Sequence, residues 1–206
     1  MTGKRRVKRG PVSAADLLAR LRSQPEWLAD RAKAERALQE AEAKLREAEA
    51  PIIEELNSVG CEVGTVWDLV NSRAPYRSAI PVLLKHLTGP YPDRVREGLA
   101  RALATPLANQ GWTALAHAFE EEQETRPNGV KWALALALGA SATSKEVDEV
   151  IRWSRDASLG EVRAPLLDAL SRCGEQRCLD ALTELVDDPV IGKDAEAALR
   201  RARRHR

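Results

Sequence analysis

A ten-residue pattern that recurs four times constrains the fold of this chain more than any other feature. Each copy begins with an aliphatic residue, at Val95, Val130, Val162 and Ile191. Each carries Ala and Leu seven and eight positions later, as Ala102–Leu103, Ala137–Leu138, Ala169–Leu170 and Ala198–Leu199. Apolar residues at this spacing lie on one face of an α-helix. Because Ala lets a neighbouring helix approach and Leu fills the space beside it, we expect the pairs to be buried between stacked helices.

The first copy is the second half of a longer stretch, 80–104, that reads as two short amphipathic helices. A Gly-Pro-Tyr-Pro turn separates them. One such pair of helices cannot bury its apolar side alone, whereas stacked pairs can. The chain is 44% apolar but only 4% aromatic, and it lacks the alternation of apolar and polar residues that indicates strands. The sequence therefore predicts an all-α fold.

The paired helices resemble those of HEAT-like repeat proteins, whose units join an IPxLLxxL helix to a D…VRxxAxxAL helix. In this chain the pattern is carried by Ile80, Pro81, Val82, Leu83 and Leu84 with Asp93, Val95, Arg96, Ala102 and Leu103, and again by Val162, Arg163, Ala169 and Leu170. The resemblance covers residues 63–204 and implies an α-solenoid of about four helical hairpins. The last copy departs from it, with Gly192 and Glu196 in place of a basic and an apolar residue. Residues 80–104 and the upstream VWDLVNSRAPY are also similar to a group of bacterial HEAT-like proteins.

A long, highly charged helix is predicted before the repeats. Ser13 is a plausible N-cap of a short helix that ends near Gln24, and Pro25 suits the first turn of the long one. The long helix carries a heptad-like seam of Trp27, Ala34, Leu38, Ala41, Leu45, Ala48 and Ile52. Arg31 breaks this seam, and Pro51 is expected to interrupt the helix or to start a new segment. The seam indicates either a coiled-coil dimerisation arm or, the interpretation we favour, a helix that packs along its own repeats.

These features divide the chain into a basic N-terminal tail (1–12), N-terminal helices (13–60) and a HEAT-like repeat domain (61–206) with a basic C-terminal tip. Ten of the 32 basic residues lie at 1–10 and 200–206, which leaves 22 basic against 31 acidic residues in the rest. No run of residues has the length and apolarity of a signal peptide or a membrane span. We therefore expect a cytoplasmic protein with no membrane contact and with Cys61, Cys173 and Cys178 as reduced thiols.

The second residue of the repeat is basic in three copies, as Arg96, Lys131 and Arg163. In a stacked array these residues would form a ladder. One interpretation is structural: the cations meet carboxylates such as Asp93, Asp156 or Asp188 and tie neighbouring units together. The other is a basic stripe that faces a phosphate backbone or an acidic partner.

Other candidate binding residues are aromatic or charged. Trp132 lies off the predicted buried face and is a candidate anchor for a partner, or core if a loop covers it. A second group near the first repeat consists of Trp67, Asp68, Tyr76, Tyr91 and Arg94, together with Arg96. The run of Glu120, Glu121, Glu122 and Glu124 at a helix end indicates a solvated end or, alternatively, an acidic dock for a basic partner.

No catalytic, cofactor-binding or metal-binding residue is predicted. The sequence has no Gly-rich phosphate loop, nucleophile elbow, HExxH motif or paired CxxC motif. His86, His117 and His205 do not fall at ligand spacings, and we expect the first two to be partly buried helix residues. The chain is therefore not expected to be an enzyme and not expected to need a cofactor.

Three functions fit the predicted architecture. The first is a non-enzymatic scaffold that binds another macromolecule, foremost a protein, because stacked repeats present extended surfaces. The second is nucleic-acid binding through the basic tails and a HEAT-like groove, as the resemblance to HEAT-like DNA glycosylases allows. The third is an enzyme or accessory subunit that resembles HEAT-like bilin lyases. The chain is expected to be a monomer, or a dimer through the N-terminal helix.

Overall fold

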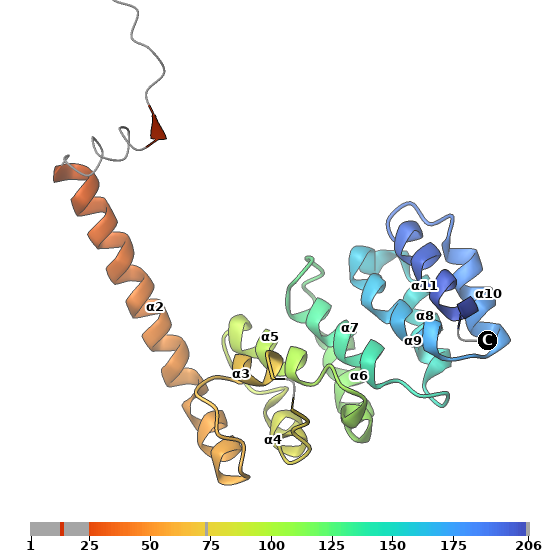
Figure 1. Ribbon diagram of the computed structural model, residues 1–206, viewed down its shortest axis with the longest axis horizontal. Helices are drawn as coiled ribbons and strands as arrows, with labels where there is room; N and C mark the ends of the chain where they lie inside the picture. Colours follow the sequence, from red (N-terminus) through yellow and green to blue (C-terminus); the bar gives the residue numbers. More distant parts are fainter. Residues whose placement is uncertain (1–12, 15–24, 73, 205–206) are drawn as a thin grey trace, which may run out of the picture. The chain divides into compact units, whose positions relative to one another are not determined.

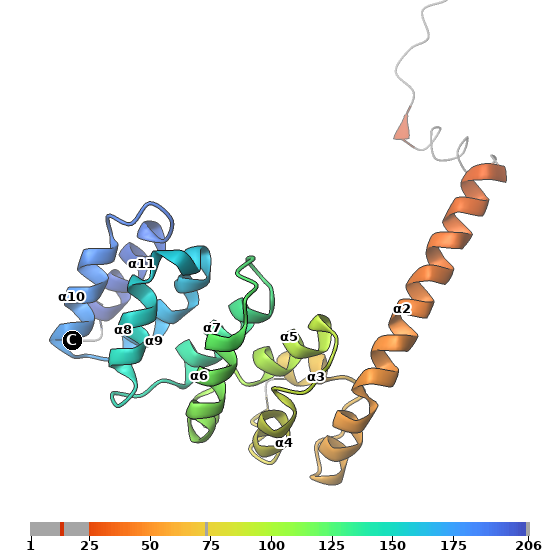
Figure 2. The same cartoon turned by 180° about the vertical axis from the view of Figure 1, so that it is seen from behind.

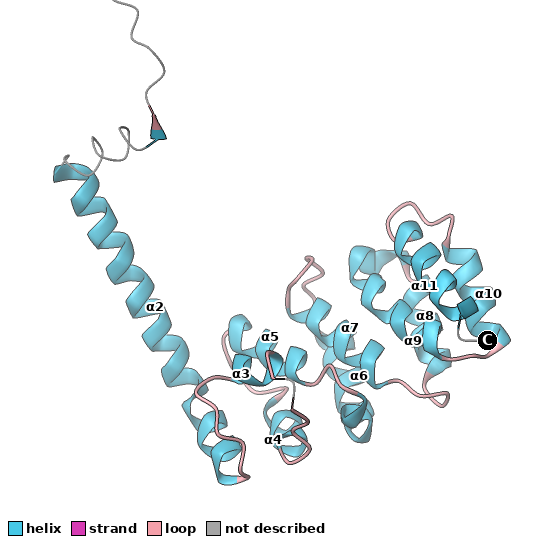
Figure 3. Cartoon of the chain, in the orientation of Figure 1, coloured by secondary structure: helices cyan, strands magenta, loops and turns pink. Residues whose placement is uncertain are grey.

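The computed structural model describes residues 13–14, 25–72 and 74–204. These residues form helices and loops, with no strand among them, and the all-α prediction is confirmed (Figure 3). The helices are α2 (Pro25–Ser58), α3 (Val66–Val70), α4 (Ala79–His86), α5 (Asp93–Ala102), α6 (Trp112–Glu121), α7 (Val130–Ser141), α8 (Val147–Arg155), α9 (Leu167–Arg172), α10 (Gln176–Leu185) and α11 (Gly192–Arg204). Two 3₁₀ segments, η1 (Pro106–Gly111) and η2 (Ala157–Leu166), precede α6 and α9.

The chain divides into two compact units, residues 1–44 and 45–206. The division falls inside α2, ahead of the boundary expected at residue 61. The reason is that the C-terminal part of α2 contributes to the core of the second unit, where Ile52 and Leu56 are fully buried. The predicted basic tail (1–12), most of the helix predicted from Ser13 to Gln24, and residues 205–206 lie outside the described residues.

Helix α2 is described from Pro25 onward. Because residues 15–24 lie outside the described part of the chain, a helix start at Pro25 stays a prediction. The helix does not break at Pro51 and continues through this residue to Ser58. Proline removes one backbone hydrogen bond from a helix interior, and burial of Ile52 and Leu56 on the next turns offsets that loss. The predicted burial of the seam is confirmed for Ile52 and holds in part for Leu45 and Ala48, which are half-buried. It is wrong for Ala34, Leu38 and Ala41, which are exposed.

In the second unit, each helix of the repeat contacts the next one along the chain. Helix α5 packs on α7, α7 packs on η2 and α9, and α9 packs on α11, while α6, α8 and α10 each contact the helix that follows them (Figures 1 and 2). All four Ala–Leu pairs lie between these helices and are at most 7% exposed. The predicted burial of the pairs is confirmed, and one continuous apolar core runs from Ile52 to Ala202.

The third copy of the repeat differs from the single helix that its sequence predicts. Its first part is the 3₁₀ segment η2, and α-helix resumes only at Leu167. Pro165 accounts for the break, because it lacks the N–H that an α-helix needs at this position. The α7 helix approaches this break so closely that a Cβ on Gly139 would lie 2.4 Å from the carbonyl oxygen of Pro165.

Two further expectations are corrected by the structure. A disulfide joins Cys173 to Cys178 across the α9–α10 turn, where reduced thiols were expected, and Cys61 is a free thiol. The fold brings the two sulfur atoms together, which spacing alone does not reveal. The basic C-terminal tip is, up to Arg204, the end of helix α11. No helix of the described residues is long and apolar enough to cross a membrane.

Candidate functional site

One residue of the basic ladder, Arg163, forms a buried ion pair with Asp188. The guanidinium of Arg163 is 1% exposed, and its Nη1 and Nη2 donate to the two carboxylate oxygens of Asp188 at 2.7 and 3.0 Å. Arg163 Nε also donates to the carbonyl oxygen of Gly160 at 2.9 Å. The bidentate pair, together with the backbone N–H groups of Ile191 and Val190, holds the pKa of Asp188 well below its ordinary value. The structural interpretation is confirmed for this copy.

Lys131 is likewise withdrawn from the surface. It is 6% exposed, and its Nζ donates to the backbone carbonyl oxygen of Glu122 at 2.6 Å and lies 5.0 Å from the ring centre of Phe119. Burial lowers the pKa of Lys131, and the nearby carboxylates of Glu122, Asp156 and Glu120 oppose that effect. Because neither Lys131 nor Arg163 reaches the surface, the structure does not present the ladder as a basic stripe.

Arg96, the remaining member of the ladder, stays at the surface. Its side chain is 30% exposed, and it bonds to the carboxylate of Glu122 and, at 3.4 Å, to that of Asp93. Burial alone would raise the pKa of Glu122, but the backbone N–H of Glu124 and the guanidinium of Arg96 outweigh it and lower this pKa. Glu122 therefore links the first and second copies of the repeat through Arg96 and Lys131.

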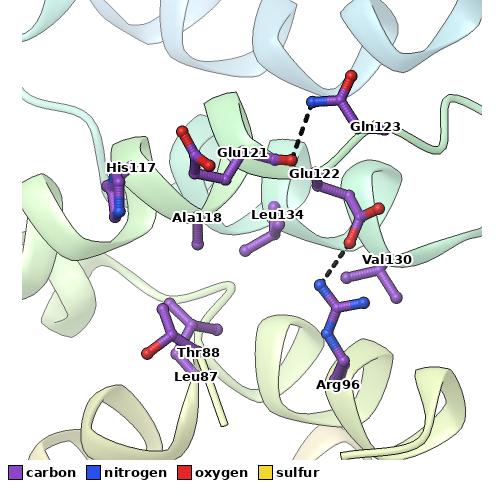
Figure 4. Close-up of a pocket in the computed structure, with 10 residues that line it drawn as sticks. All are labelled: Leu87, Thr88, Arg96, His117, Ala118, Glu121, Glu122, Gln123, Val130 and Leu134. Atoms are coloured by element: carbon purple, nitrogen blue, oxygen red, sulfur yellow. Dashed lines mark hydrogen bonds and ion pairs between the residues drawn. The ribbon is translucent and has the colours of Figure 1, made fainter. Parts of the chain in front are cut away.

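A cleft opens beside the Arg96–Glu122 pair, with a volume of about 380 Å³. Figure 4 shows its lining residues, which come from α5, α6, α7 and the loops after α4 and α6. The apolar residues are Leu87, Ala118, Val130 and Leu134, and the polar ones are Thr88, Arg96, His117, Glu121, Glu122 and Gln123. The cleft thus combines an apolar floor with a polar rim, which is the usual composition of a binding site.

The acidic run at the end of α6 is largely engaged within the protein. Glu120 pairs with Arg152 at 2.8 Å, Glu122 pairs with Arg96, and Glu124 pairs with Arg126 at 2.6 Å. Glu120 and Glu121 are exposed, as expected of a solvated helix end, whereas the side chain of Glu122 is only 11% exposed. Among the described residues, only Glu121 of this run has a side chain without an ion-pair partner, and it is exposed at the rim of the cleft.

Part of the predicted aromatic and charged group does assemble. The guanidinium of Arg94 lies 3.6 Å from the ring centre of Trp67, and Trp67 Nε1 donates to the carbonyl oxygen of Arg94 at 3.3 Å. Such stacking of a cation on an aromatic face is attractive. Trp67 also packs on the helical Gly98, where a Cβ would lie 2.9 Å from its indole nitrogen. Asp68 instead caps α3, since its carboxylate accepts from the N–H groups of Gly64 and Thr65, which lowers its pKa.

The two tyrosines of that group are engaged separately. The Tyr76 hydroxyl donates to the carbonyl oxygen of Ala102 at 2.8 Å, and burial raises its pKa. The Tyr91 hydroxyl lies 2.6 Å from Nδ1 of His86, whose Nε2 lies 2.8 Å from the carboxylate of Glu55. Residue spacing could not predict this hydrogen-bonded network of three side chains, because Glu55 is on α2 and far from both partners along the chain.

The remaining predictions concern Trp132 and the histidines. Trp132 is half-buried and packs against the core, which is intermediate between the two alternatives considered. His86 is partly buried as expected, whereas His117 is exposed at the cleft. In the described part of the chain, no group of three or more His, Cys, Asp or Glu residues could hold a metal ion.

The chain was compared with known proteins at three levels. No protein-family model, no curated protein sequence and no solved structure matched it.

Proposed function

We propose that this chain is a HEAT-like α-solenoid that binds another protein without catalysing a reaction, and that the cleft beside Arg96 and Glu122 is its binding site. The observation that carries the proposal is the pairing of an apolar floor with one exposed, unpaired carboxylate, that of Glu121. The stacking of successive helices supports the solenoid part of the proposal, because such arrays present extended surfaces to partners. The resemblance of the repeats to HEAT-like units supports it as well.

The cleft indicates the chemistry of the partner. Its floor can take an apolar side chain that contacts Leu87, Ala118 and Leu134. Arg96 is already held by Glu122, so the charge at the rim that lacks an ion-pair partner among the described residues is the negative one of Glu121. We therefore expect a protein segment that places an apolar residue next to Lys or Arg.

The proposal can be tested with peptides selected from a random library against the full chain. We expect the selected peptides to carry a basic residue beside an apolar one. Their affinity, measured by fluorescence anisotropy, should fall roughly tenfold for Glu121→Lys, because an attraction becomes a repulsion. Ala118→Leu should also weaken binding, since the added side chain occupies the floor.

Glu161→Lys is the matched control. Glu161 is exposed, has no ion-pair partner among the described residues and does not line the cleft, so the same change of charge should leave affinity unaltered. Circular dichroism would verify that each variant is folded. Peptides that bind the wild type, Glu121→Lys and Ala118→Leu equally well would contradict the assignment of the cleft.

Nucleic-acid binding is the second candidate function, and one observation favours it. Arg201, Arg203 and Arg204 are exposed at the C-terminal end of α11, and none of them forms an ion pair with a described residue. Binding of this kind would be independent of sequence and would weaken steeply with salt. An anisotropy titration with duplex and single-stranded DNA, repeated after all three are changed to Glu, tests it. Affinity that survives the substitution would contradict the role of α11.

The third interpretation, an enzyme or accessory subunit resembling HEAT-like bilin lyases, has no feature of the described residues in its support, and we do not propose it.

A further inference from the structure

We propose that the exposed N-terminal part of α2 pairs with the same part of a second copy of this chain, in an antiparallel coiled coil. The segment is Pro25–Lys44, and it is separate from the cleft. Two of its large apolar side chains are exposed, Leu28 at 50% and Leu38 at 60%. Leu38 belongs to the heptad seam, with Ala34 and Ala41 on either side of it, and Leu28 lies next to that seam, which Arg31 interrupts.

A helix of this length needs a partner to be well formed. Twenty residues of α-helix span about 30 Å, and most of the stability of such a helix in a protein comes from packing of its apolar face. Along Pro25–Lys44 no side chain is buried: Trp27 and Ala32 are half-buried and the others are exposed. A partner that covers the surface around Leu38 would supply the missing packing.

The shape of this surface suits a second copy of itself. In an antiparallel pair, each a position faces a d position of the other helix, so Leu38 of one copy meets the partner's Ala34 and Ala34 meets the partner's Leu38. Alternation of a large and a small side chain lets the two helices approach closely and fill the space between them. In the same register, Trp27 meets the partner's Leu45, which is itself only half-buried.

Charge selects the antiparallel orientation. It places Asp30 beside the partner's Lys44, and it sets Arg31 against the partner's Ala41 with the partner's Glu42 next to it. The same register brings Glu35, which is already paired with Arg31, beside the partner's Glu35. Asp30, Glu42 and Lys44 have no ion-pair partner among the described residues, whereas Arg31 pairs with Glu35 of its own helix at 2.9 Å and lies 5.5 Å from the ring centre of Trp27. A parallel pair in register would instead set Arg31 against the partner's Arg31, and Asp30 against the partner's Glu35. Like charges at these positions oppose association.

The first test is the concentration dependence of the mass of the full chain, measured by sedimentation velocity and light scattering. We expect a monomer–dimer equilibrium in the wild type. Leu38→Glu should weaken it at least tenfold, because a carboxylate would enter the contact. Gln39→Glu is the matched control: it adds the same group one residue further, on the outer side of the helix, and should leave the equilibrium unchanged.

A charge exchange tests the orientation. Asp30→Lys should weaken the dimer several-fold by setting Lys against the partner's Lys44, and adding Lys44→Asp should restore it. In a parallel pair, Asp30→Lys would meet the partner's Glu35 and strengthen the dimer, which would overturn the proposed arrangement. A chain that stays monomeric at every concentration, as it would if residues 13–24 covered the seam, would overturn the proposal outright. A dimer that survives Leu38→Glu would do the same.

Discussion

Arg163 and Arg96 occupy the same position in two copies of one repeat, but their side chains differ in how far the fold buries them. The side chain of Arg163 is 1% exposed, whereas that of Arg96 is 30% exposed. Both pair with a carboxylate more than twenty residues further along the chain, Asp188 and Glu122 respectively. The comparison shows that the repeat position places the two cations at equivalent points of the fold. The segment that supplies the carboxylate determines whether the ion pair is buried.

The two carboxylates differ in what else they hold. Asp188 lies in the turn before α11, and one of its oxygens accepts from the N–H groups of Val190 and Ile191 at 2.8 and 3.0 Å. The Arg163–Asp188 ion pair therefore joins the start of α11 to η2 and lies between them. Glu122 lies directly after α6 and lines the cleft, and its side chain is 11% exposed, close to the 15% of Asp188, so the two pairs differ in the burial of the arginine. We expect the first pair to act on stability and the second to act on binding.

The largest effect should come from Arg163→Ala. Removing one partner of a buried ion pair leaves the other charge uncompensated, and we expect the free energy of unfolding to fall by about 3–5 kcal/mol. Urea unfolding followed by circular dichroism would measure it. If Arg163→Ala lowered the free energy of unfolding no more than Arg96→Ala does, burial of the ion pair would contribute nothing to stability, and the comparison would fail.

Asp188→Asn should have the next largest effect and should depend on pH. The amide keeps one acceptor oxygen but loses the charge, so we expect a loss of about 1.5–3 kcal/mol at pH 7. Folding lowers the pKa of Asp188. Its ionised form therefore stabilises the fold fully above its unfolded pKa of about 4, and less as pH falls toward the folded pKa.

The difference in unfolding free energy between wild type and Asp188→Asn should accordingly shrink as the pH is lowered from about 5 to 3. Urea titrations at several pH values would show this. A difference that stays constant over that range would indicate that the charge of Asp188 is not what stabilises the pair.

Gly139→Ala should be destabilising by roughly 1–3 kcal/mol, because the added methyl group would meet the backbone of Pro165. The sign is informative, since the same change at an exposed helical glycine is stabilising. Ala118→Leu is the comparison on the cleft side, where the larger side chain has room, and we expect a change within about 0.5 kcal/mol. Thermal unfolding of both variants would test whether the two regions differ in packing as described.

Arg96→Ala should lower the free energy of unfolding by only about 1 kcal/mol or less, because a partly exposed pair is screened by solvent. Peptide affinity at the cleft should change more than stability does, since Glu122 would then be free to act as a second carboxylate at the rim. A loss of stability as large as that of Arg163→Ala would remove the distinction between the two sites.

Most of the fold was predictable because it depends on local regularity. Apolar residues at helical spacing located the helices of the second unit, and the recurring Ala–Leu pairs identified the faces that are buried. The Pro–Tyr–Pro turn between α4 and α5 follows from the backbone limits of proline in the same way. Pro51 was misjudged because packing of the residues after it, a nonlocal contribution, keeps the helix intact.

The candidate site was less predictable. The basic position of the repeat was visible, but its division into two buried cations and one at the surface was not, and neither was the position of His117 at the rim. The link from Glu55 through His86 to Tyr91, and the disulfide between Cys173 and Cys178, were missed for the same reason. These contacts join side chains on different elements, and spacing along the chain carries no information about which elements meet.

By itself, the sequence determined an all-helical chain of recurring helix pairs with buried Ala–Leu contacts, because helical periodicity and side-chain size act over a few turns. Only the tertiary structure decided which carboxylate pairs with each cation and where the cleft lies. Those outcomes depend on how the loops between helices fold back, and on desolvation that is set by the whole surroundings of a group.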